Sequence, residues 1–257
     1  MNKQKDLLDY YSEKYNNERF IETDPISIPH RFSRLQDIEI AGFWTAILSW
    51  GNRKSIINSG NKLMTLMGES PYQFMLEHKE KDKLVFKDFC HRTFNFTDSL
   101  YFLDFFQRFY LKNHSLEEAF IDDSFDQESG LDLYLEHFYN EFFSNTEQPF
   151  RTKKHISRPS SNSRCKRLIM FLRWMVRSDN KGVDFGIWKR ISMKQLMIPL
   201  DVHVERTARK LELLNRTPLD WKAVVELTIA CRNMNPEDPA IYDYALFGLS
   251  LENKIIL

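Results

Sequence analysis

One carboxylate, Asp201, stands at the expected start of a helix, in the segment IPLDVHVER (residues 198–206). Val204, Ala208 and Leu211 follow at the spacing of a buried helix face. A carboxylate at such a position accepts backbone N–H groups, and the positive end of the helix dipole favours its ionised form. Spacing alone therefore makes Asp201 an ordinary helix cap, with a charge fixed in place.

Positive charge gathers in one stretch, although the chain as a whole is neutral. Residues 151–177 contain nine Lys and Arg and no acid, whereas residues 117–147 contain ten acids. Lys and Arg displace the counterions condensed on a phosphate backbone, so a positive stretch is what nucleic-acid binding needs. The alternative is a solvated helix face beside a basic loop. The residues selected for phosphate contacts are Lys153, Lys154, Arg158, Arg164 and Arg167.

Two segments resemble the helix-hairpin-helix DNA glycosylase superfamily. PLDVHVERTARKL (residues 199–211) is similar to its segment [Val/Leu]-Asp-Thr-His-Val-x-Arg-x-x-x-Arg-Leu, and EIAGFWTAILSWGNR (residues 39–53) resembles its early helix, which ends in Leu-Ser before polar residues. The resemblance implies that Asp201 is the catalytic carboxylate. It also implies that Asn52 and Arg53 fill the gap that a flipped-out base leaves in the duplex. On the residues alone, the second segment is a helix C-terminus with Gly51 in the left-handed conformation.

The resemblance further implies a lysine nucleophile, for which Lys166 in SRCKRL (residues 163–168) is the candidate. Neighbouring cations favour the neutral, nucleophilic amine, but the same surroundings suit a lysine that contacts phosphate. The hairpin PSSNS (residues 159–163) departs from the family because it lacks glycine. The 35 residues between Lys166 and Asp201 exceed the usual separation, although an archaeal 8-oxoguanine branch with a rebuilt hairpin is also stretched.

The function that this resemblance implies is excision of a damaged base from double-stranded DNA, with or without cleavage of the resulting abasic site. No metal and no cofactor are expected, and no cysteine cluster follows the last helix as it does in the iron–sulfur branch. The alternative is a nucleic-acid-binding helical module without catalytic activity. A third interpretation is a scaffold that binds protein through the acidic stretch. The whole chain also resembles an uncharacterised bacterial family with Pro-Leu-Asp and Tyr-Asp-x-Ala-Leu-Phe-Gly-Leu blocks, which has no established activity.

Helical periodicity dominates the elements that must position these residues, and no long alternating strand pattern occurs. The expected fold is all-α, with many helices in two glycosylase-like lobes. A helical region of residues 1–150 is expected to precede a basic hairpin-like segment with the C-terminal helices, residues 151–257, and the lobes are allowed to interpenetrate. Asp98 is the expected N-cap of one helix, and Asp238 and Asp243 are assigned to caps and core or, alternatively, to the active-site cleft. The expected helices are 38–50, 53–67, a short one after Ser70-Pro71, 98–111, 116–120, 131–143, 164–176, 201–214, 219–232 and 240–250.

Composition excludes several other classes. A chain of 257 residues with 42% hydrophobic residues can bury a substantial core. Its polar N-terminal segment lacks the apolar region of a secretory signal, and no apolar run approaches the length of a membrane span. Three widely separated cysteines give neither a disulfide framework nor a metal-binding spacing. We therefore expect a cytoplasmic monomer, associated with the nucleoid if the source is bacterial.

Overall fold

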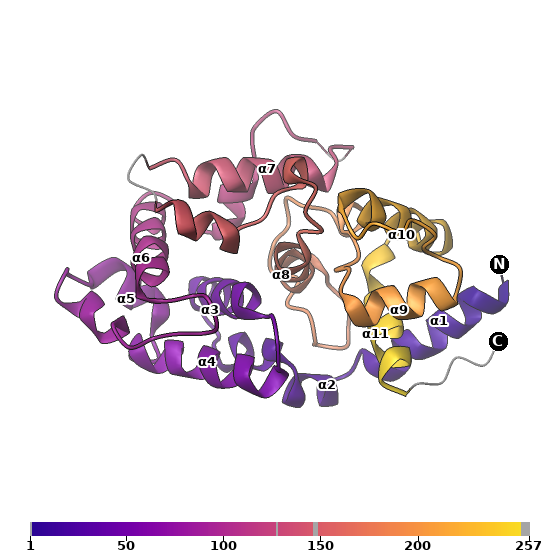
Figure 1. Cartoon of the computed structure of the whole chain (residues 1–257), viewed down its shortest axis with the longest axis horizontal. Helices are drawn as coiled ribbons and strands as arrows, with labels where there is room; N and C mark the ends of the chain where they lie inside the picture. The colour runs from indigo at the N-terminus through magenta and orange to yellow at the C-terminus, as the bar shows by residue number, and fades with distance from the viewer. Residues whose placement is uncertain (1, 127, 146–148, 253–257) are drawn as a thin grey trace. The chain divides into compact units, whose positions relative to one another are not determined.

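The computed structural model describes residues 2–126, 128–145 and 149–252. Glu147, one of the ten acids, and Gln148, at the start of the predicted break, lie outside these residues. Among the described residues, every regular element is a helix, and the one β-type pairing is an isolated bridge between His91 and Phe94. The predicted all-α class is confirmed (Figure 1).

The α-helices in chain order are α1 (Asn2–Tyr15), α2 (Glu18–Thr23), α3 (Leu35–Leu48), α4 (Arg53–Leu66), α5 (Pro71–Glu77), α6 (Phe96–Tyr110), α7 (Leu131–Phe142), α8 (Lys166–Val176), α9 (Val202–Lys210), α10 (Trp221–Met234) and α11 (Tyr242–Glu252). The short 3-10 helices are η1 (Pro25–Ser27), η2 (Pro29–Arg31), η3 (Asp82–Phe86), η4 (Leu116–Phe120), η5 (Phe150–His155), η6 (Pro159–Ser161), η7 (Met193–Gln195) and η8 (Pro239–Ile241).

The chain forms two compact units from interleaved segments. Unit 1 comprises Met1–Glu22, Phe125–Leu133 and Arg158–Leu257, and unit 2 comprises Thr23–Ser124 and Tyr134–Ser157. The sequence placed a single boundary between residues 150 and 151 and allowed interpenetration. The interleaving arises because the polar N-terminal segment forms α1, whose apolar side is buried by the far end of the chain.

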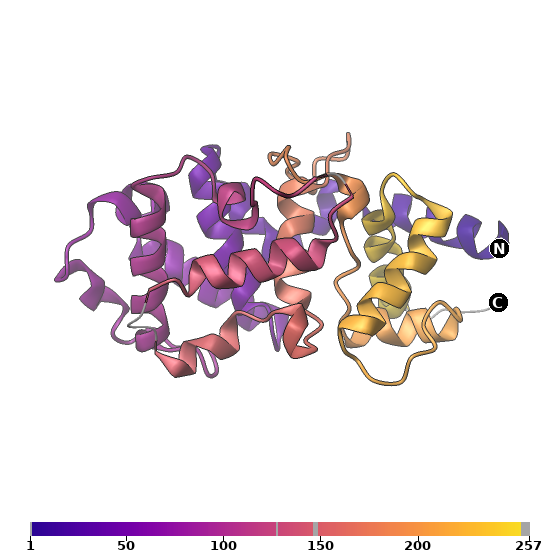
Figure 2. The same cartoon turned by 90° about the horizontal axis from the view of Figure 1, so that it is seen from above.

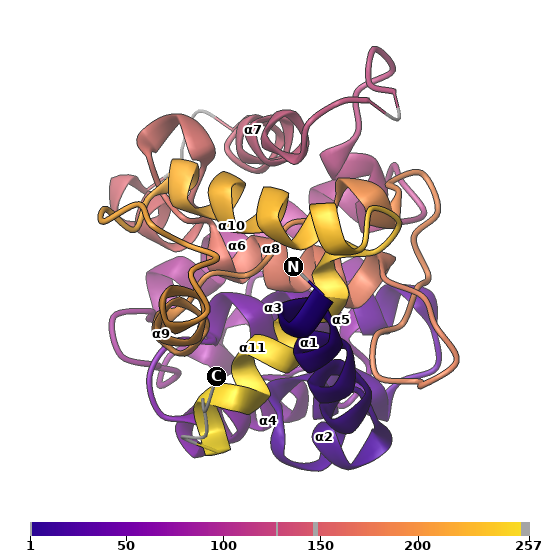
Figure 3. The same ribbon diagram turned by 90° about the vertical axis from the view of Figure 1, so that its right-hand side faces the viewer.

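In unit 1, α11 packs against both α1 and α9 (Figures 2 and 3). Several hydrogen bonds tie α1 to the C-terminal segment. Ser12 Oγ donates to the carbonyl of Ile241 (3.2 Å), Tyr15 Oη donates to Glu252 Oε1 (2.7 Å), and Tyr242 Oη donates to Asp9 Oδ1 (2.8 Å). A Cβ on Gly248 would overlap the ring of Tyr15, so the glycine permits the two helices to approach closely.

The core of unit 2 is aromatic. Phe43 and Trp44 of α3 are fully buried and both contact Phe102 of α6, with ring centroids 6.0 and 5.0 Å apart. Phe138 and Phe142 of α7 pack on Phe43 from the other direction, at 5.4 and 6.1 Å. Aromatic pairs at these separations add to the stabilisation that burial itself provides. The core fixes α3, whose C-terminus leads into the loop before Asn52.

Two predicted helix boundaries are wrong for identifiable reasons. Asp98 is not an N-cap, because α6 begins earlier: Asn95 is the cap, and Asp98 accepts the Asn95 N–H (3.0 Å) as the third helical residue of a capping box. The helix that starts after Asp201 ends at Lys210 rather than at residue 214, and Glu212 follows with a φ of +55°. The segment 116–120 is helical but of the 3-10 type.

Candidate active site at Lys166 and Asp201

Asp201 is the N-cap of α9, as its position in the sequence predicted. Its Oδ1 accepts the backbone N–H of His203 (2.8 Å) and of Val204 (3.0 Å). The helix itself is anchored because Val204 and Ala208 are buried. These bonds fix the carboxylate and leave Oδ2 available for another partner.

Lys166 supplies that partner within unit 1. It is the first residue of α8, and its Nζ lies 3.9 Å from Asp201 Oδ2 and 3.5 Å from the sulfur of Met170. The side chains are about one quarter exposed, Lys166 at 25% and Asp201 at 27%, so both remain accessible to a substrate. The fold therefore brings together the two residues that the resemblance selected, across 35 residues of sequence.

The hairpin before α8 bends without glycine. Asn162 and Cys165 have φ values of +56° and +49°, in the left-handed region that glycine usually occupies. Asn162 ends the 3-10 turn η6, and Cys165 is the N-cap of α8 without a capping hydrogen bond from its side chain. The elements between residues 150 and 161 are 3-10 turns, so a full α-helix does not precede this hairpin.

Two of the nine basic residues in the stretch 151–177 are buried, so its positive charge does not all lie on the surface. Arg173 is buried, with its guanidinium paired to Asp243 and, at 3.3 Å, to Asp184. Arg177 is buried too and contacts Asp184 (3.1 Å) and Asp238 (2.9 Å). Most of this network was hidden in the sequence, because Asp184, Asp238 and Asp243 lie 7 to 70 positions from the arginines that they contact, although Asp179, which also pairs with Arg177, is only two positions away.

The same network extends to the candidate site through Asp243, which is 7% exposed. Burial raises the pKa of Asp243 to about 6, and Arg173 opposes that rise. The charge of Asp201 raises the pKa further and that of Lys166 lowers it, so Asp243 lies within electrostatic range of both. Its assignment to the core is confirmed, and it also faces the charges of the site.

The other basic residues of the stretch 151–177 that belong to unit 1 lie just before α8 or in its first turn. Arg158 is the N-cap of η6, and Arg158, Arg164 and Arg167 are all half-buried. Burial lowers the pKa of the Arg167 guanidinium to about 10, which leaves it charged at neutral pH. Their role as DNA contacts stays a prediction.

The other predicted contacts belong to unit 2. Lys153 is half-buried and Lys154 exposed, both in η5. Asn52 is exposed and caps α4, where its Oδ1 accepts the backbone N–H three residues on (3.3 Å). Arg53 lies 3.8 Å from Asp24. The basic stretch is thus divided between the two units at residues 157 and 158.

The loop before Asn52 has the backbone that the sequence predicted. Gly51 has a φ of +104°, and a Cβ there would overlap the guanidinium of Arg92, which packs over the glycine. Arg92 itself has a φ of +54° at the turn closed by the bridge between His91 and Phe94. Sequence reasoning missed this second loop, and nothing local in its residues signals that it meets residue 51.

A buried charge cluster beneath the same loop was also missed. Asp98 has no exposed side-chain surface and accepts hydrogen bonds from Arg151 (2.7 Å) and Thr152 (2.9 Å). His155 Nε2 lies 3.2 Å from Asp98, and the His155 ring stacks on Trp50 with centroids 5.8 Å apart. The cluster therefore links the start of α6 to the end of the α3 segment.

The described residues contain no group of three His, Cys, Asp or Glu side chains arranged to hold a metal ion. No helix in the described part of the chain has the length and continuous apolar character that crossing a lipid bilayer requires.

Comparison with known proteins gives one match. Neither the curated proteins nor the solved structures contain a match to this chain. A family model described as "Protein of unknown function (DUF2400)" matches residues 24–252, which is most of the chain. The matched residues include Lys166 and Asp201 and the loops at Gly51 and Arg92. The chain belongs to the DUF2400 family.

Proposed function

We propose that this protein excises damaged bases from double-stranded DNA, with Lys166 as nucleophile and Asp201 as its charged partner. The observation that carries the proposal is the 3.9 Å separation of Lys166 Nζ and Asp201 Oδ2. A lysine amine and a fixed carboxylate are the two groups that a glycosylase with lyase activity needs. The resemblance of residues 199–211 to the glycosylase segment selects Asp201, and the lysine nucleophile that the same superfamily carries before this segment selects Lys166.

In the proposed reaction, the neutral amine of Lys166 attacks C1′ of the damaged nucleotide while the N-glycosidic bond breaks. The base departs with the bonding electron pair and takes up a proton. Asp201 stabilises the positive charge that develops on the sugar and accepts a proton from the attacking amine. Opening of the sugar ring gives a Schiff base, and loss of a C2′ proton then expels the 3′ phosphate.

Two observations support these roles of Lys166 and Asp201. The backbone N–H groups of His203 and Val204 hold Asp201 Oδ1, so the carboxylate need not reorganise during the reaction. Arg173 is paired with Asp243 and cannot take the place of Lys166 beside Asp201.

A second candidate function is nucleic-acid binding without catalysis. The hairpin favours it, because a glycine-free turn after 3-10 elements departs from the hairpin of the superfamily. Such a module would bind DNA and leave the damaged base in place.

Borohydride reduction tests the two functions against each other. The protein is incubated with duplexes that contain an abasic site or 8-oxoguanine, and the reduced Schiff base is detected as a covalent adduct. We expect the wild-type protein to be trapped, Lys166→Gln to give no adduct, and Asp201→Asn to react about 10²- to 10⁴-fold more slowly. Lys222→Gln, at an exposed lysine of α10, is the matched control and should be trapped like wild type.

Each other outcome has a definite meaning. Base release without an adduct would leave Asp201 as the catalyst and remove Lys166 as nucleophile. DNA binding with neither release nor adduct on any lesion would establish the binding module instead. An adduct that persists in Lys166→Gln would assign the nucleophile to another amine.

A further inference from the structure

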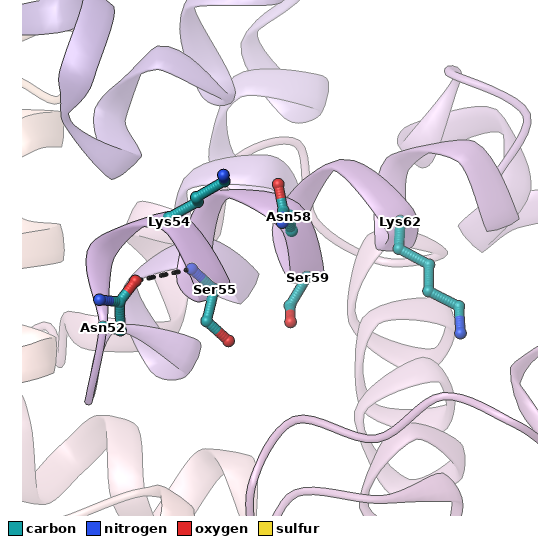
Figure 4. Close-up of a pocket in the computed structure, with 6 residues that line it drawn as sticks. All are labelled: Asn52, Lys54, Ser55, Asn58, Ser59 and Lys62. Carbon is teal, nitrogen blue, oxygen red and sulfur yellow. Dashed lines mark hydrogen bonds between the residues drawn. The ribbon is translucent and has the colours of Figure 1, made fainter.

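The solvent-facing side of α4 carries a polar groove that begins at Asn52, one of the predicted DNA contacts, and continues along the helix beyond it. The groove has a volume of about 380 Å³. Figure 4 shows the side chains that line it. Its lining side chains share one property: they are amines, hydroxyls and carboxamides, and none is a carboxylate. They are Asn52, Lys54, Ser55, Asn58, Ser59 and Lys62.

Packing on the opposite side holds this face outward. Ile56, Leu63 and Met64 of α4 are buried, and Gly60 lies so close to Ile28 that a Cβ would overlap its side chain. The helix cannot rotate without exposing these residues. The polar groove is consequently a permanent feature of the unit 2 surface.

The charge of the groove is not neutralised locally. Within the described residues, neither Lys54 nor Lys62 forms an ion pair with a carboxylate. Lys62 Nζ donates one hydrogen bond, to the carbonyl of Asp88 at 3.3 Å, which leaves two of its protons for a ligand. The groove thus offers two ammonium groups to whatever occupies it.

The spacing of the two lysines indicates an extended anion. They are eight residues apart on one helix face, which corresponds to about 12 Å along the axis. One strand of a DNA duplex advances about 3.4 Å per phosphate, so this span covers several consecutive phosphates. The two lysines can therefore contact different phosphates of one strand.

Hydroxyl groups between the two lysines add hydrogen-bonding groups to the positive charge of the groove. Ser59 Oγ lies 2.8 Å from Nδ1 of the buried His91. This contact holds the Ser59 hydroxyl at the wall of the groove. Ser55, one turn earlier on the helix, offers a second hydroxyl. Phosphate oxygens accept hydrogen bonds from such groups.

We propose that the α4 groove binds the phosphodiester backbone of duplex DNA through Lys54 and Lys62. This inference rests on the proposed function, because it takes duplex DNA as the ligand. It adds a contact surface outside the basic stretch of residues 151–177, and this surface binds phosphates without regard to base sequence. Lys54 and Lys62 were not among the predicted DNA contacts, because they lie outside the basic stretch of residues 151–177.

The salt dependence of DNA binding tests the proposal. The dissociation constant for an undamaged duplex is measured with the full chain between 50 and 200 mM salt, for wild type and for Lys54→Gln/Lys62→Gln. Each phosphate contact contributes about 0.9 to the slope of log K against log salt, so we expect the double variant to flatten the slope by about 2. Lys54→Arg/Lys62→Arg should restore the wild-type slope, because arginine keeps the charge.

A charge-matched control separates the groove from net charge. Lys79→Gln/Lys112→Gln removes two exposed lysines of the same unit and should leave the slope unchanged. If wild type and Lys54→Gln/Lys62→Gln have equal slopes and borohydride trapping is intact, the groove does not bind the DNA backbone, but the proposed base excision still stands. Absence of DNA binding by the wild-type protein would overturn both. Saturable binding of inorganic phosphate that requires Lys54 and Lys62, with an unchanged DNA slope, would assign the groove to free phosphate and refute the DNA assignment.

Discussion

A carboxylate without exposed surface, such as Asp98, must be satisfied entirely by its neighbours. Burial acts to raise the pKa of Asp98, but His155, the Asn95 N–H and the Thr152 hydroxyl outweigh burial, so the pKa is lowered overall. A carboxyl group whose pKa is lower in the folded protein stabilises the fold above its unfolded pKa of about 3.9. That stabilisation disappears as the pH falls through the folded value.

Replacing Asp98 by Asn should therefore destabilise the protein in a pH-dependent way. At pH 7 we expect a loss of about 3–5 kcal/mol in the free energy of unfolding, because Arg151 and His155 lose a buried partner. The difference from wild type should shrink as the pH falls below about 4, because the unfolded chain then takes up a proton at Asp98 before the folded protein does. Urea unfolding at pH 7 and pH 3 measures it, with the exposed Asp88→Asn as control. A constant difference between the two pH values would contradict the prediction.

Local sequence identified residues whose role depends on near neighbours and failed for those with distant ones. Asp201 could be placed as a cap because the groups that it accepts are two and three residues away. Arg173 and Arg177 were counted with the surface cations because their partners Asp184 and Asp243 are set by tertiary packing. The proximity of Lys166 to Asp201 likewise came only from a family resemblance.

At the scale of elements, the hairpin before α8 places residues other than glycine in the left-handed backbone conformation, which is strained for most side chains. A residue other than glycine in the left-handed region costs of order 1–3 kcal/mol unless its side chain tolerates that conformation, as asparagine does. Asn162 is exposed and has a φ of +56°. The structure thus explains how the hairpin turns without the glycine that the superfamily uses.

Substitutions at Asn162 should report this strain directly. Asn162→Gly is expected to keep or slightly raise the free energy of unfolding, whereas Asn162→Val should lower it by about 1–3 kcal/mol. Urea unfolding compares the two variants, which differ from wild type at an exposed position and change little packing. Equal stability of the valine and glycine variants would show that the left-handed backbone is not maintained in solution.

The contact between α1 and α11 is another element-scale feature that helix periodicity could not reveal. The segment before residue 20 looked merely polar, yet it forms a helix whose Tyr15 ring lies against Gly248. Periodicity predicted most helices of the chain within a few residues, because their buried stripes are strong. It could not predict which helices pack together, because the buried faces of different helices have the same kinds of apolar residues.

Gly248→Ala should destabilise unit 1 because the added methyl group overlaps the Tyr15 ring. We expect a loss of about 1–3 kcal/mol, typical of overpacking, and a large coupling energy between Gly248→Ala and Tyr15→Ala in a double-mutant cycle. Thermal or urea unfolding of the four proteins provides the measurement. Leu251→Ala, at an exposed position of the same helix, serves as the control. Strict additivity of the two substitutions would rule out the close contact.

For the whole molecule, the sequence predicted the helical class but not the division of the chain. Helical periodicity and the lack of an alternating strand pattern predicted the helical class, whereas the segments of each unit are chosen by long-range packing. The same packing divides the basic stretch, so Lys153 and Lys154 belong to one unit and Arg158, Arg164 and Arg167 to the other.

The pairing of α1 with α11 also sets an order of events during protein synthesis. All segments of unit 2 have been made once residue 157 leaves the ribosome, whereas unit 1 needs residues from both α1 and α11. Domains fold as units while the chain emerges, so α1 has to wait, with its apolar side uncovered, until more than 200 further residues have been added. A nascent chain interrupted before α11 therefore contains every segment of unit 2 but cannot complete the unit that holds Lys166 and Asp201.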